Sequence, residues 1–298
     1  MGDYTFLIPS VDNLFEINKP IGQFSGYKTG GNASYYFEPN NLKQLTEAIT
    51  FCKDFGKKYK VIGNGTNLLI SDFGYDGLII SLKKLSKIVN VNDFEVKVNA
   101  GANLNALINF CLDNGLSGLE SLYGIPATIG GAVCMNAGAF NTQIFDSVSV
   151  IEFIKNNKFY RIDINSCKHS YRSTRFLHND DVIISVRFIF KPCDKNTIYN
   201  KMQECLINRK TLQPSGKSCG SVFKNPKGYF AGELIEKTGL KGYKIGGAEV
   251  STKHANFILA KDNCTSLDIK RLIDLIKTEV YNKFNVKLTE EIEYLGDF

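Results

Sequence analysis

The chain has 298 residues, of which 43% are hydrophobic and 22% are charged, and its formal net charge is +6. This composition is that of a globular protein with room for two domains, and no low-complexity tract interrupts it. The lysines are scattered along the chain, whereas nucleic-acid binding favours a concentrated basic stripe. The longest apolar run, Val182 to Phe190, is interrupted by Arg187 and is too short to span a bilayer. We therefore expect neither nucleic acid nor a membrane as a partner.

The eight cysteines are widely spaced without a C-x-x-C pair, and the three histidines show no i,i+4 pairing. At this length a disulfide framework is not expected, and the spacing lacks the pattern of a zinc site. The opening residues Met1-Gly2-Asp3-Tyr4 lead directly into mixed sequence without a signal-peptide pattern. We therefore predict a protein without a metal site in a reducing, cytoplasmic compartment.

Hydrophobic periodicity and turn residues predict a first half that is rich in strands. The alternation in the segments 77–82, 87–91 and 94–100, as in Phe94, Val96 and Val98, predicts half-buried antiparallel strands. Asn40 or Asn41 supplies the N-cap of a helix that ends before Gly56. In chain order we expect strands 33–37, 59–62 and 68–70 around a helix at 42–55, strands 77–82, 87–91 and 94–100, a helix at 103–114, and strands 147–154, 158–162 and 181–191.

The second half begins with a linker predicted at 192–195, where the β-rich half ends. Ser266 is expected to cap a long amphipathic helix near the C-terminus. The other expected elements are helices 197–210 and 229–238 and strands 255–260 and 286–295. With no internal repeat evident, the outline is an α+β chain.

Two glycine-rich segments interrupt this pattern, and each admits two interpretations. Residues 124–139 contain four glycines and no charge, so they either pack tightly in a core or offer backbone N–H groups to an anion. The turn Gly63-Asn64-Gly65-Thr66-Asn67 lies between two strands, which differs from the strand–turn–helix of a Rossmann fingerprint. It is either a structural turn or a phosphate cradle. Gly216-Lys217-Ser218 is not a P-loop, because the earlier glycine and the preceding strand are missing.

Seven motifs, in this order along the chain, carry a resemblance to a known family. They are Thr29-Gly30-Gly31, Gly63 to Leu69, Gly124 to Ala139, Tyr171-Arg172-Ser173-Thr174-Arg175-Phe176, Gly220 to Pro226, Gly246-Gly247-Ala248 with His254 to Phe257, and Leu288 to Ile292. From about residue 20 to residue 296 the chain resembles the UDP-N-acetylenolpyruvoylglucosamine reductases (MurB), flavoenzymes of peptidoglycan precursor synthesis. A chance match of seven ordered motifs is very improbable.

The resemblance implies the fold and the cofactor. It implies an α+β fold with a two-part FAD-binding domain of the vanillyl-alcohol-oxidase type at residues 1–192, divided into about 1–75 and 76–192. An α+β substrate-binding domain follows at residues 193–298. FAD is expected to be non-covalent, with its pyrophosphate held by backbone N–H groups of both glycine segments. The residues expected to bind FAD are Gly63, Asn64, Gly65, Thr66, Asn67, Leu68, Gly124, Pro126, Thr128, Gly130, Gly131, Ala132, Asn136 and Gly138.

The resemblance also implies a two-step reduction with NADPH as co-substrate. NADPH passes a hydride to FAD, and the reduced flavin passes it to the methylene carbon of the enolpyruvyl ether of UDP-N-acetylenolpyruvoylglucosamine. Negative charge develops at the adjacent carbon, so the site needs a fixed positive donor and an acid. The motif positions imply Arg172 as the stabiliser, Ser221 as the proton donor and Glu291 as the third catalytic group. The residues expected at the substrate are Tyr171, Arg209, Lys210, Lys224, Asn225 and His254.

The residues themselves leave several alternatives open. Without the resemblance, Arg172 is better explained as a surface ion-pair partner, Ser221 as a turn residue and Glu291 as part of a solvated acidic face. The pair Thr289-Glu290 stands where the family usually has Glu-Pro, so the catalytic glutamate is Glu291 or Glu290. The sequence between Arg172 and Ser221 has no room for the tyrosine-bearing loop of one branch of the family. The chain therefore resembles the branch that lacks this loop.

Two rival functions also stay open: another FAD-dependent oxidoreductase on the same fold, and a nucleotide-binding protein without turnover. The motif at 220–226 and Glu291 favour the reductase over the first rival. The joint presence of Arg172, Ser221 and Glu291 argues against the second. We further expect a monomer. Because residues 124–139 are expected to form the floor of the pyrophosphate site, we predict that Gly130→Val lowers flavin affinity before it lowers stability.

Overall fold

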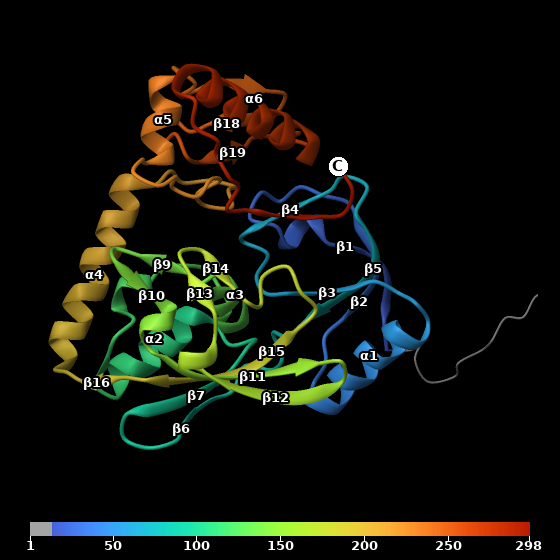
Figure 1. Ribbon diagram of the computed structural model, residues 1–298, viewed down its shortest axis with the longest axis vertical. Coiled ribbons are helices and arrows are strands. Elements are labelled where there is room, and N and C mark those ends of the chain that lie inside the picture. The colour runs from blue at the N-terminus through green and yellow to red at the C-terminus, as the bar shows by residue number, and fades with distance from the viewer. Residues whose placement is uncertain (1–13) are drawn as a thin grey trace, which may run out of the picture.

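The first part of the chain folds as two sheets with their helices, and the C-terminal part folds as a smaller unit beside them (Figure 1). The computed structural model describes residues 14–298. Residues 1–13, where we expect no targeting signal, lie outside the described residues. Within residues 14–298, every helix is too short or too polar to traverse a lipid bilayer.

The first sheet consists of strands β1 (Glu16–Pro20), β2 (Asn32–Phe37), β3 (Tyr59–Ile62) and β5 (Tyr75–Ser81). Its order is β1-β2-β5-β3, with β1 antiparallel to β2 and the other pairs parallel. Our prediction of a half-buried antiparallel strand at 77–82 is therefore wrong. Five consecutive residues of β5 are buried, as is typical of a parallel strand covered on both faces. The connection from β2 to β3 is helix α1 (Leu42–Asp54), whose N-cap is Asn41.

The second sheet is antiparallel throughout, with the order β12-β11-β15-β7-β6. Helices α2 and α3 belong to this part of the chain, and their N-caps are Asn103 and Thr128. The expected strands and the expected helix at 103–114 are found here with small shifts at their ends. The bounds are β6 Ile88–Asn90, β7 Glu95–Asn99, α2 Leu104–Asp113, α3 Ile129–Cys134, β11 Val148–Lys155, β12 Lys158–Asp163 and β15 Val182–Ile189.

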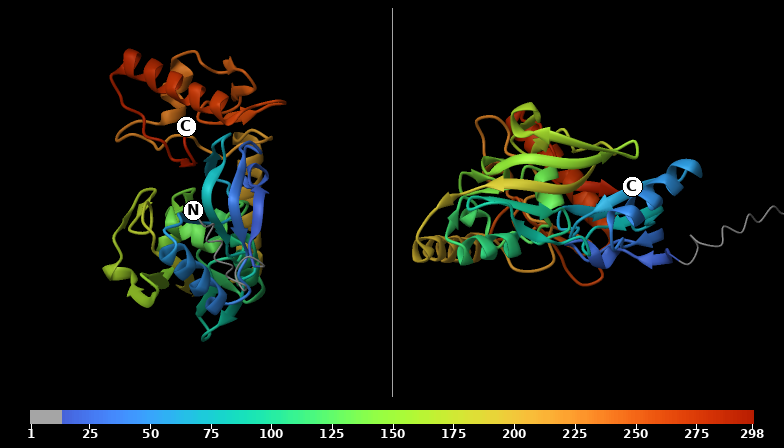
Figure 2. Two further views of the ribbon diagram at one scale, coloured as in Figure 1. Left: turned by 90° about the vertical axis from the view of Figure 1, so that its right-hand side faces the viewer. Right: turned by 90° about the horizontal axis from the view of Figure 1, so that it is seen from below.

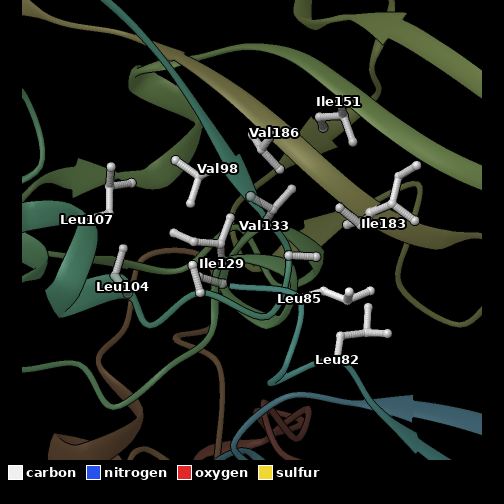
Figure 3. Close-up of a cluster of buried hydrophobic side chains, with 14 of the residues drawn as sticks. Leu82, Leu85, Val98, Leu104, Leu107, Ile129, Val133, Ile151, Ile183 and Val186 are labelled. Carbon is white, nitrogen blue, oxygen red and sulfur yellow. The ribbon is translucent and has the colours of Figure 1, made fainter. Parts of the chain in front are cut away.

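One hydrophobic core joins the two sheets with α2 and α3. Figure 3 shows Ile129 and Val133 of α3 among side chains of the second sheet such as Val98 and Val186. Burial of this face stabilises α3, which is too short to be stable by itself. The glycine-rich segment 124–139 is therefore anchored in the core through one side of its helix.

Helix α4 (Lys195–Leu212) runs along one side of the molecule toward the C-terminal unit (Figure 1). It follows the predicted linker, but β16 (Lys191–Pro192) pairs there with β8 (Leu116–Ser117), so the link is an ordered strand. The buried face of α4 packs into the first core through Ile198 and Met202. We therefore propose a domain boundary near residue 213 in place of residue 193.

The C-terminal unit has its own core, in which α6 (Ser266–Phe284) packs on a three-stranded sheet. The prediction that Ser266 caps this helix is wrong by one residue. Thr265 is the N-cap and forms a capping box with Asp268, in which each side chain accepts from the other residue's backbone N–H. The remaining bounds are α5 Ala231–Lys237, β17 Lys244–Ile245, β18 Ala248–Val250 and β19 Ile258–Ala260.

The C-terminal strand β20 (Glu293–Leu295) returns to the first part of the chain, where it pairs in parallel with β4 (Leu68–Ile70). The strand predicted at 286–295 is therefore much shorter. Its earlier residues make an isolated bridge between Glu290 and Phe223. Figure 2 shows the same relation from two further sides, with the C-terminus close to the strands of the first part. This return brings the end of the chain next to the turn at 63–67.

Two short hairpins complete the frame of the site. One pairs β9 with β10, and the other pairs β13 with β14. Four 3-10 turns lie between the larger elements. The bounds are β9 Gly138–Ala139, β10 Thr142–Gln143, β13 His169–Ser170, β14 Ser173–Thr174, η1 Gly22–Phe24, η2 Glu120–Leu122, η3 Ile144–Asp146 and η4 Ile164–Ser166.

Candidate active site

A cavity of about 540 Å³ lies where the two sheets and the C-terminal unit meet. Both glycine-rich segments line it, and so do Arg172, Ser221 and Glu291. These three side chains come from a hairpin, a loop and the approach to the last strand, which are far apart in the sequence. Of the residues expected to bind FAD, all but Asn136 line the cavity.

The turn at 63–67 offers unoccupied backbone donors to the cavity. Its five N–H groups make no hydrogen bond with any other described residue. The turn is held by its other groups, since Asn64 Nδ2 and Thr66 Oγ1 both donate to the Pro126 carbonyl at 3.1 Å. Gly65 has a φ of +70°, and a Cβ on it would lie 2.3 Å from the Phe24 carbonyl oxygen. The turn therefore requires glycine there, and a row of free N–H groups in such a turn suits an anion.

The segment 124–139 uses its backbone donors differently. The N–H groups of Ile129 and Gly130 donate to the carbonyls of Ala102 and Ala100, each at 2.8 Å. The Gly131 N–H donates to Thr128 Oγ1 at 3.3 Å, the N-cap bond of α3. We expected both segments to hold a pyrophosphate through N–H groups. In the structure the turn at 63–67 leaves its N–H groups free, whereas those of Ile129, Gly130 and Gly131 in the second segment already have acceptors.

Arg172 is fixed by three acceptors. Its Nε–H donates to Glu291 Oε1 at 2.6 Å, and its two terminal nitrogens donate to the carbonyls of Asn136 at 3.3 Å and Gly138 at 2.6 Å. Arg172 itself adopts a left-handed backbone with a φ of +51° at the tip of the β13–β14 hairpin. A non-glycine residue in this region stores strain that surrounding contacts must hold, as is common at functional sites. The guanidinium is thus presented to the cavity in one orientation.

Glu291 is the acidic partner of Arg172 in the cavity. Its carbonyl accepts from Asn67 Nδ2 at 2.9 Å, and its N–H donates to the Val222 carbonyl at 2.7 Å. Burial raises the pKa of its carboxyl above 4.5, although Arg172 and Lys224 act to lower it. Glu290 is the other candidate for the catalytic glutamate. Its carboxylate accepts a hydrogen bond from Lys277 Nζ at 2.8 Å. Of the two glutamates, only Glu291 shares the cavity with Arg172.

Ser221 lies in the loop between α4 and α5 and is half-buried at the cavity wall. The loop is held by a bridge between Ser221 and Phe257, and by the Asn256 side chain. That amide accepts from the Phe223 N–H at 3.0 Å and donates to the Phe223 carbonyl at 2.8 Å. The Ser221 hydroxyl makes no hydrogen bond with another described residue, so its proton is available to a ligand.

The residues predicted to bind the substrate divide into two groups. Arg209 lines the cavity, where its side chain donates to the carbonyls of Tyr123 at 3.0 Å and Ser121 at 3.2 Å. Burial lowers the pKa of its guanidinium. The others lie outside the wall of the cavity as the structure has it: Tyr171, Lys210, Lys224, Asn225 and His254. Among these, the Asn225 N–H lies 3.5 Å from the Tyr171 hydroxyl, so these two sit side by side.

The sequence reasoning missed a further side of the cavity, formed by Lys60, residues 177–183 and Glu293. His178 Nδ1 lies 3.3 Å from Glu293 Oε2, and the Tyr59 hydroxyl donates to the Asp180 carbonyl at 3.3 Å. These contacts place the connection before β15 across one side of the cavity. No local sequence pattern indicates this side of the cavity, because β3, the connection before β15 and β20 come together only in the folded chain.

Two family models match the chain. One describes the C-terminal domain of UDP-N-acetylenolpyruvoylglucosamine reductase and covers residues 213–295, and the other describes an FAD binding domain and covers residues 33–157. The first begins where α4 has ended, close to the boundary that the packing favours.

Curated relatives match nearly the whole chain. The UDP-N-acetylenolpyruvoylglucosamine reductase of Carboxydothermus hydrogenoformans is 39% identical over 282 residues, which cover 94% of this chain and 93% of the relative. The protein of the same name from Clostridium novyi is 37% identical over 278 residues, or 92% and 90% of the two chains.

Solved structures agree with these matches. The crystal structure of UDP-N-acetylenolpyruvylglucosamine reductase (MurB) from Thermus caldophilus superposes with a TM-score of 0.83 at 30% identity, covering 95% of this chain and all of that one. A glucose dehydrogenase, Phl p 4.0202, matches 61% of this chain with a TM-score of 0.51 at 12% identity, which shows the fold alone. The fold is therefore α+β, with an FAD-binding part of the vanillyl-alcohol-oxidase type, as predicted.

Proposed function

Because the chain belongs to the UDP-N-acetylenolpyruvoylglucosamine reductase family, we propose that it reduces the enolpyruvyl ether of UDP-N-acetylglucosamine to UDP-N-acetylmuramate. This reaction serves peptidoglycan precursor synthesis, with FAD as cofactor and NADPH as reductant. The observation that carries the proposal is the meeting of Arg172, Ser221 and Glu291 in one cavity beside the glycine-rich walls. Bound FAD supplies the chemistry of accepting a hydride and giving it to the substrate carbon.

The residues of the cavity fit an FAD molecule. A row of unoccupied N–H groups at 63–67 suits the two negative charges of a pyrophosphate. In the second segment, Gly131 lines the cavity and has only Thr128 Oγ1 within 4 Å of an added Cβ, at 3.3 Å, so the cavity is open to a close approach there. The same segment lines the cavity with small side chains such as Ala127, Ala132 and Ala137, which leave room for a flat aromatic ring system.

Arg172 is the group that we assign to charge stabilisation. Hydride addition to the methylene carbon leaves negative charge on the neighbouring carbon, shared with its carboxylate as an enolate. A guanidinium held by Glu291, Asn136 and Gly138 needs little reorganisation to meet that charge. Its ion pair with Glu291 is only about one-sixth exposed, at 16% and 17% of the two side chains, so solvent screens it weakly.

Ser221 is the group that we assign to protonation of the carbon next to the methylene, since it lines the cavity and its hydroxyl proton has no acceptor among the described residues. Giving up that proton leaves an alkoxide, which requires nearby positive charge. Arg172 and Lys224 both act on Glu291, and we assign them this role toward Ser221. Because burial raises the pKa of Glu291, we assign to it the proton that restores the serine.

The first experiment tests the overall reaction. The purified protein should show a flavin absorption band, and NADPH oxidation should depend on UDP-N-acetylenolpyruvoylglucosamine. Oxidation that ignores this substrate but reduces another acceptor would favour a different FAD-dependent oxidoreductase on the same fold. A colourless protein without NADPH oxidation would leave only nucleotide binding.

A second experiment tests the role of Ser221 by separating the two half-reactions in a stopped-flow instrument. In Ser221→Ala, flavin reduction by NADPH should persist, while reoxidation by the enol ether should slow about 10²- to 10⁴-fold, as expected for a lost general acid. Ser215→Ala is the matched control, because this exposed serine lies in the same loop and does not line the cavity. An equal loss in both half-reactions would make Ser221 structural.

We further propose that the protein acts as a cytoplasmic monomer of the branch without the tyrosine-bearing loop. Eight free thiols suit a reducing compartment. Between Arg172 and Ser221 the chain forms β14, β15, β16 and α4 with short connections, which supports the branch assignment. Cell fractionation and light scattering of the purified protein test the location and the oligomeric state.

A further inference from the structure

Asn136 lies behind the cavity wall, between the glycine-rich segment and the hairpin that carries Arg172. It is 1% exposed and, unlike the other residues expected to bind FAD, it does not line the cavity. Its side-chain amide donates to the Ser170 carbonyl at 2.9 Å and to Gln143 Oε1 at 2.7 Å. Both bonds lead away from the cavity, one to the β13–β14 hairpin and one to the β9–β10 hairpin.

The backbone of Asn136 serves the same hairpin. Its carbonyl accepts from a terminal nitrogen of Arg172 at 3.3 Å, two residues before Gly138, whose carbonyl accepts from the other terminal nitrogen at 2.6 Å. Asn136 thus holds Arg172 twice, at the guanidinium and at the strand that precedes it. The hold matters because Arg172 sits in a strained left-handed conformation, with a φ of +51°.

The backbone of Asn136 is itself left-handed, with a φ of +44°. Asparagine tolerates this region better than most residues do. The position therefore combines two needs, a left-handed turn after α3 and a side chain that carries two donors. Its Oδ1 is buried and has no hydrogen-bond partner among the described residues, so the bonds that this side chain makes are donations.

We propose that Asn136 is a positioning residue for Arg172, and that it is not a ligand of the cofactor. By tying Ser170 and Gln143 together, it sets the height of the β13–β14 hairpin over the cavity wall and so the place of the guanidinium. The inference rests on the proposed function, because it assumes that Arg172 stabilises charge on the substrate. It makes a distinct claim about which step of the reaction depends on Asn136.

The test is Asn136→Gly, which removes the amide and keeps a left-handed backbone without strain. We expect FAD affinity of the apoprotein and flavin reduction by NADPH to change less than twofold. Flavin reoxidation by the enol ether should slow about 10- to 100-fold, as for a misplaced catalytic group. Hydrogen exchange should speed up in the peptide spanning residues 168–175 and stay unchanged in the strands of the second sheet.

Asn141→Gly is the matched control. This asparagine is also left-handed, at a φ of +61°, and lies in the same region, but its side chain is exposed and has no hydrogen bond with another described residue. It should leave both half-reactions and the exchange pattern unchanged. If Asn136→Gly does not fold, Gln143→Met removes one of the two acceptors and should give a smaller loss confined to the same half-reaction.

Three results would overturn the proposal. They are a loss of FAD affinity in Asn136→Gly, an equal loss in both half-reactions, and full activity with faster exchange of the hairpin. The proposed function fails separately, if the unaltered protein does not turn over the enolpyruvyl substrate. The dependence of the second half-reaction on pH adds a check. A loosened Arg172 lowers the pKa of Glu291 less, so the pKa seen in that step should rise while Lys224 remains in place.

Discussion

The turn at 63–67 and the segment 124–139 both line the cavity, and they differ in how their backbone N–H groups are used. All five N–H groups of the turn are free of protein partners among the described residues, whereas Ile129 and Gly130 donate to the carbonyls of Ala102 and Ala100. The turn is anchored by side chains and carbonyls instead, such as Asn64 and Thr66 on Pro126. A segment that satisfies its own donors forms a rigid wall, and one that leaves them free is ready for an anion.

The two segments also contact different members of the proposed catalytic set, Glu291 and Arg172. The turn reaches Glu291 through the Asn67 side chain, and the longer segment reaches Arg172 through the carbonyls of Asn136 and Gly138. The bond between Arg172 and Glu291 therefore closes a ring of contacts around the cavity. Glycines in the two segments should respond differently to substitution, since they meet different neighbours.

The largest effect is expected for Gly65→Ala in the turn. The new Cβ would lie 2.3 Å from the Phe24 carbonyl oxygen, and the φ of +70° is strained for alanine. We expect a loss of unfolding free energy of about 1–3 kcal/mol, together with weaker FAD binding because the free N–H groups move. Thermal unfolding of the apoprotein and a fluorescence titration with FAD measure the two. Gly56→Ala is the control, as its φ is +61° and nothing lies within 4 Å.

A smaller effect should separate two neighbouring glycines of the longer segment, Gly130 and Gly131. Substitution by alanine gives both the same gain in helix propensity. At Gly130 the Cβ would meet the Ala100 Cβ at 3.0 Å, while at Gly131 it meets only Thr128 Oγ1 at 3.3 Å. We expect Gly130→Ala to be less stable than Gly131→Ala by about 1 kcal/mol. Gly131→Ala should instead weaken FAD binding roughly tenfold.

This pair revises our expectation for Gly130→Val. A branched side chain there presses on Ala100, whose Cβ lies 3.0 Å from an added Cβ, so it should lower stability before it lowers flavin affinity. The reverse order in thermal unfolding and FAD titration would mean that a side chain at Gly130 meets the ligand before it strains the contact with Ala100. The contrast between the two segments would then be lost.

The smallest effect concerns the pH dependence of stability. It depends on Glu291, which connects the two segments through its contacts. Its pKa is raised above 4.5 in the folded protein, so the folded state binds its proton more tightly than the unfolded state does. Its contribution to stability is full below pH 4.5 and is lost as the pH rises through the folded pKa. In Glu291→Gln this loss should vanish, so urea unfolding between pH 4 and pH 7 should show a flatter profile.

Glu290→Gln is the control for that profile, because Glu290 bonds Lys277 away from Arg172. If Glu290→Gln flattens the profile and Glu291→Gln does not, the glutamate in contact with Arg172 in solution is not the one that the structure places there.

Most local elements of the fold could be predicted, because they depend on periodicity and on caps that are neighbours in sequence. The helix at 103–114 and its ends follow from such signals, whereas the helix predicted at 197–210 extends two residues further at each end. The pairing of strands could not be predicted in the same way. The burial of β5 on both faces depends on partners from other parts of the chain. The same holds for the return of β20 to β4.

For the site, the motifs identified the residue types, and the resemblance assigned their roles. They could not show that Asn136 lies behind the wall, because its burial depends on two hairpins folding against it. They also missed the side formed by His178 and Glu293. Neither residue has a distinctive neighbour in sequence, and their contact exists only between a connection and the last strand.

The amino-acid sequence by itself determined the two glycine-rich segments, the order of the motifs and the family to which the chain belongs. These depend on residue identity and spacing along the chain. Only the tertiary structure decided which segment keeps its N–H groups free and which glutamate meets Arg172. Those outcomes depend on which carbonyls and side chains arrive from distant elements: Ala100 and Ala102 at the longer segment, and Lys277 at Glu290. A backbone donor is free or occupied only in relation to such partners.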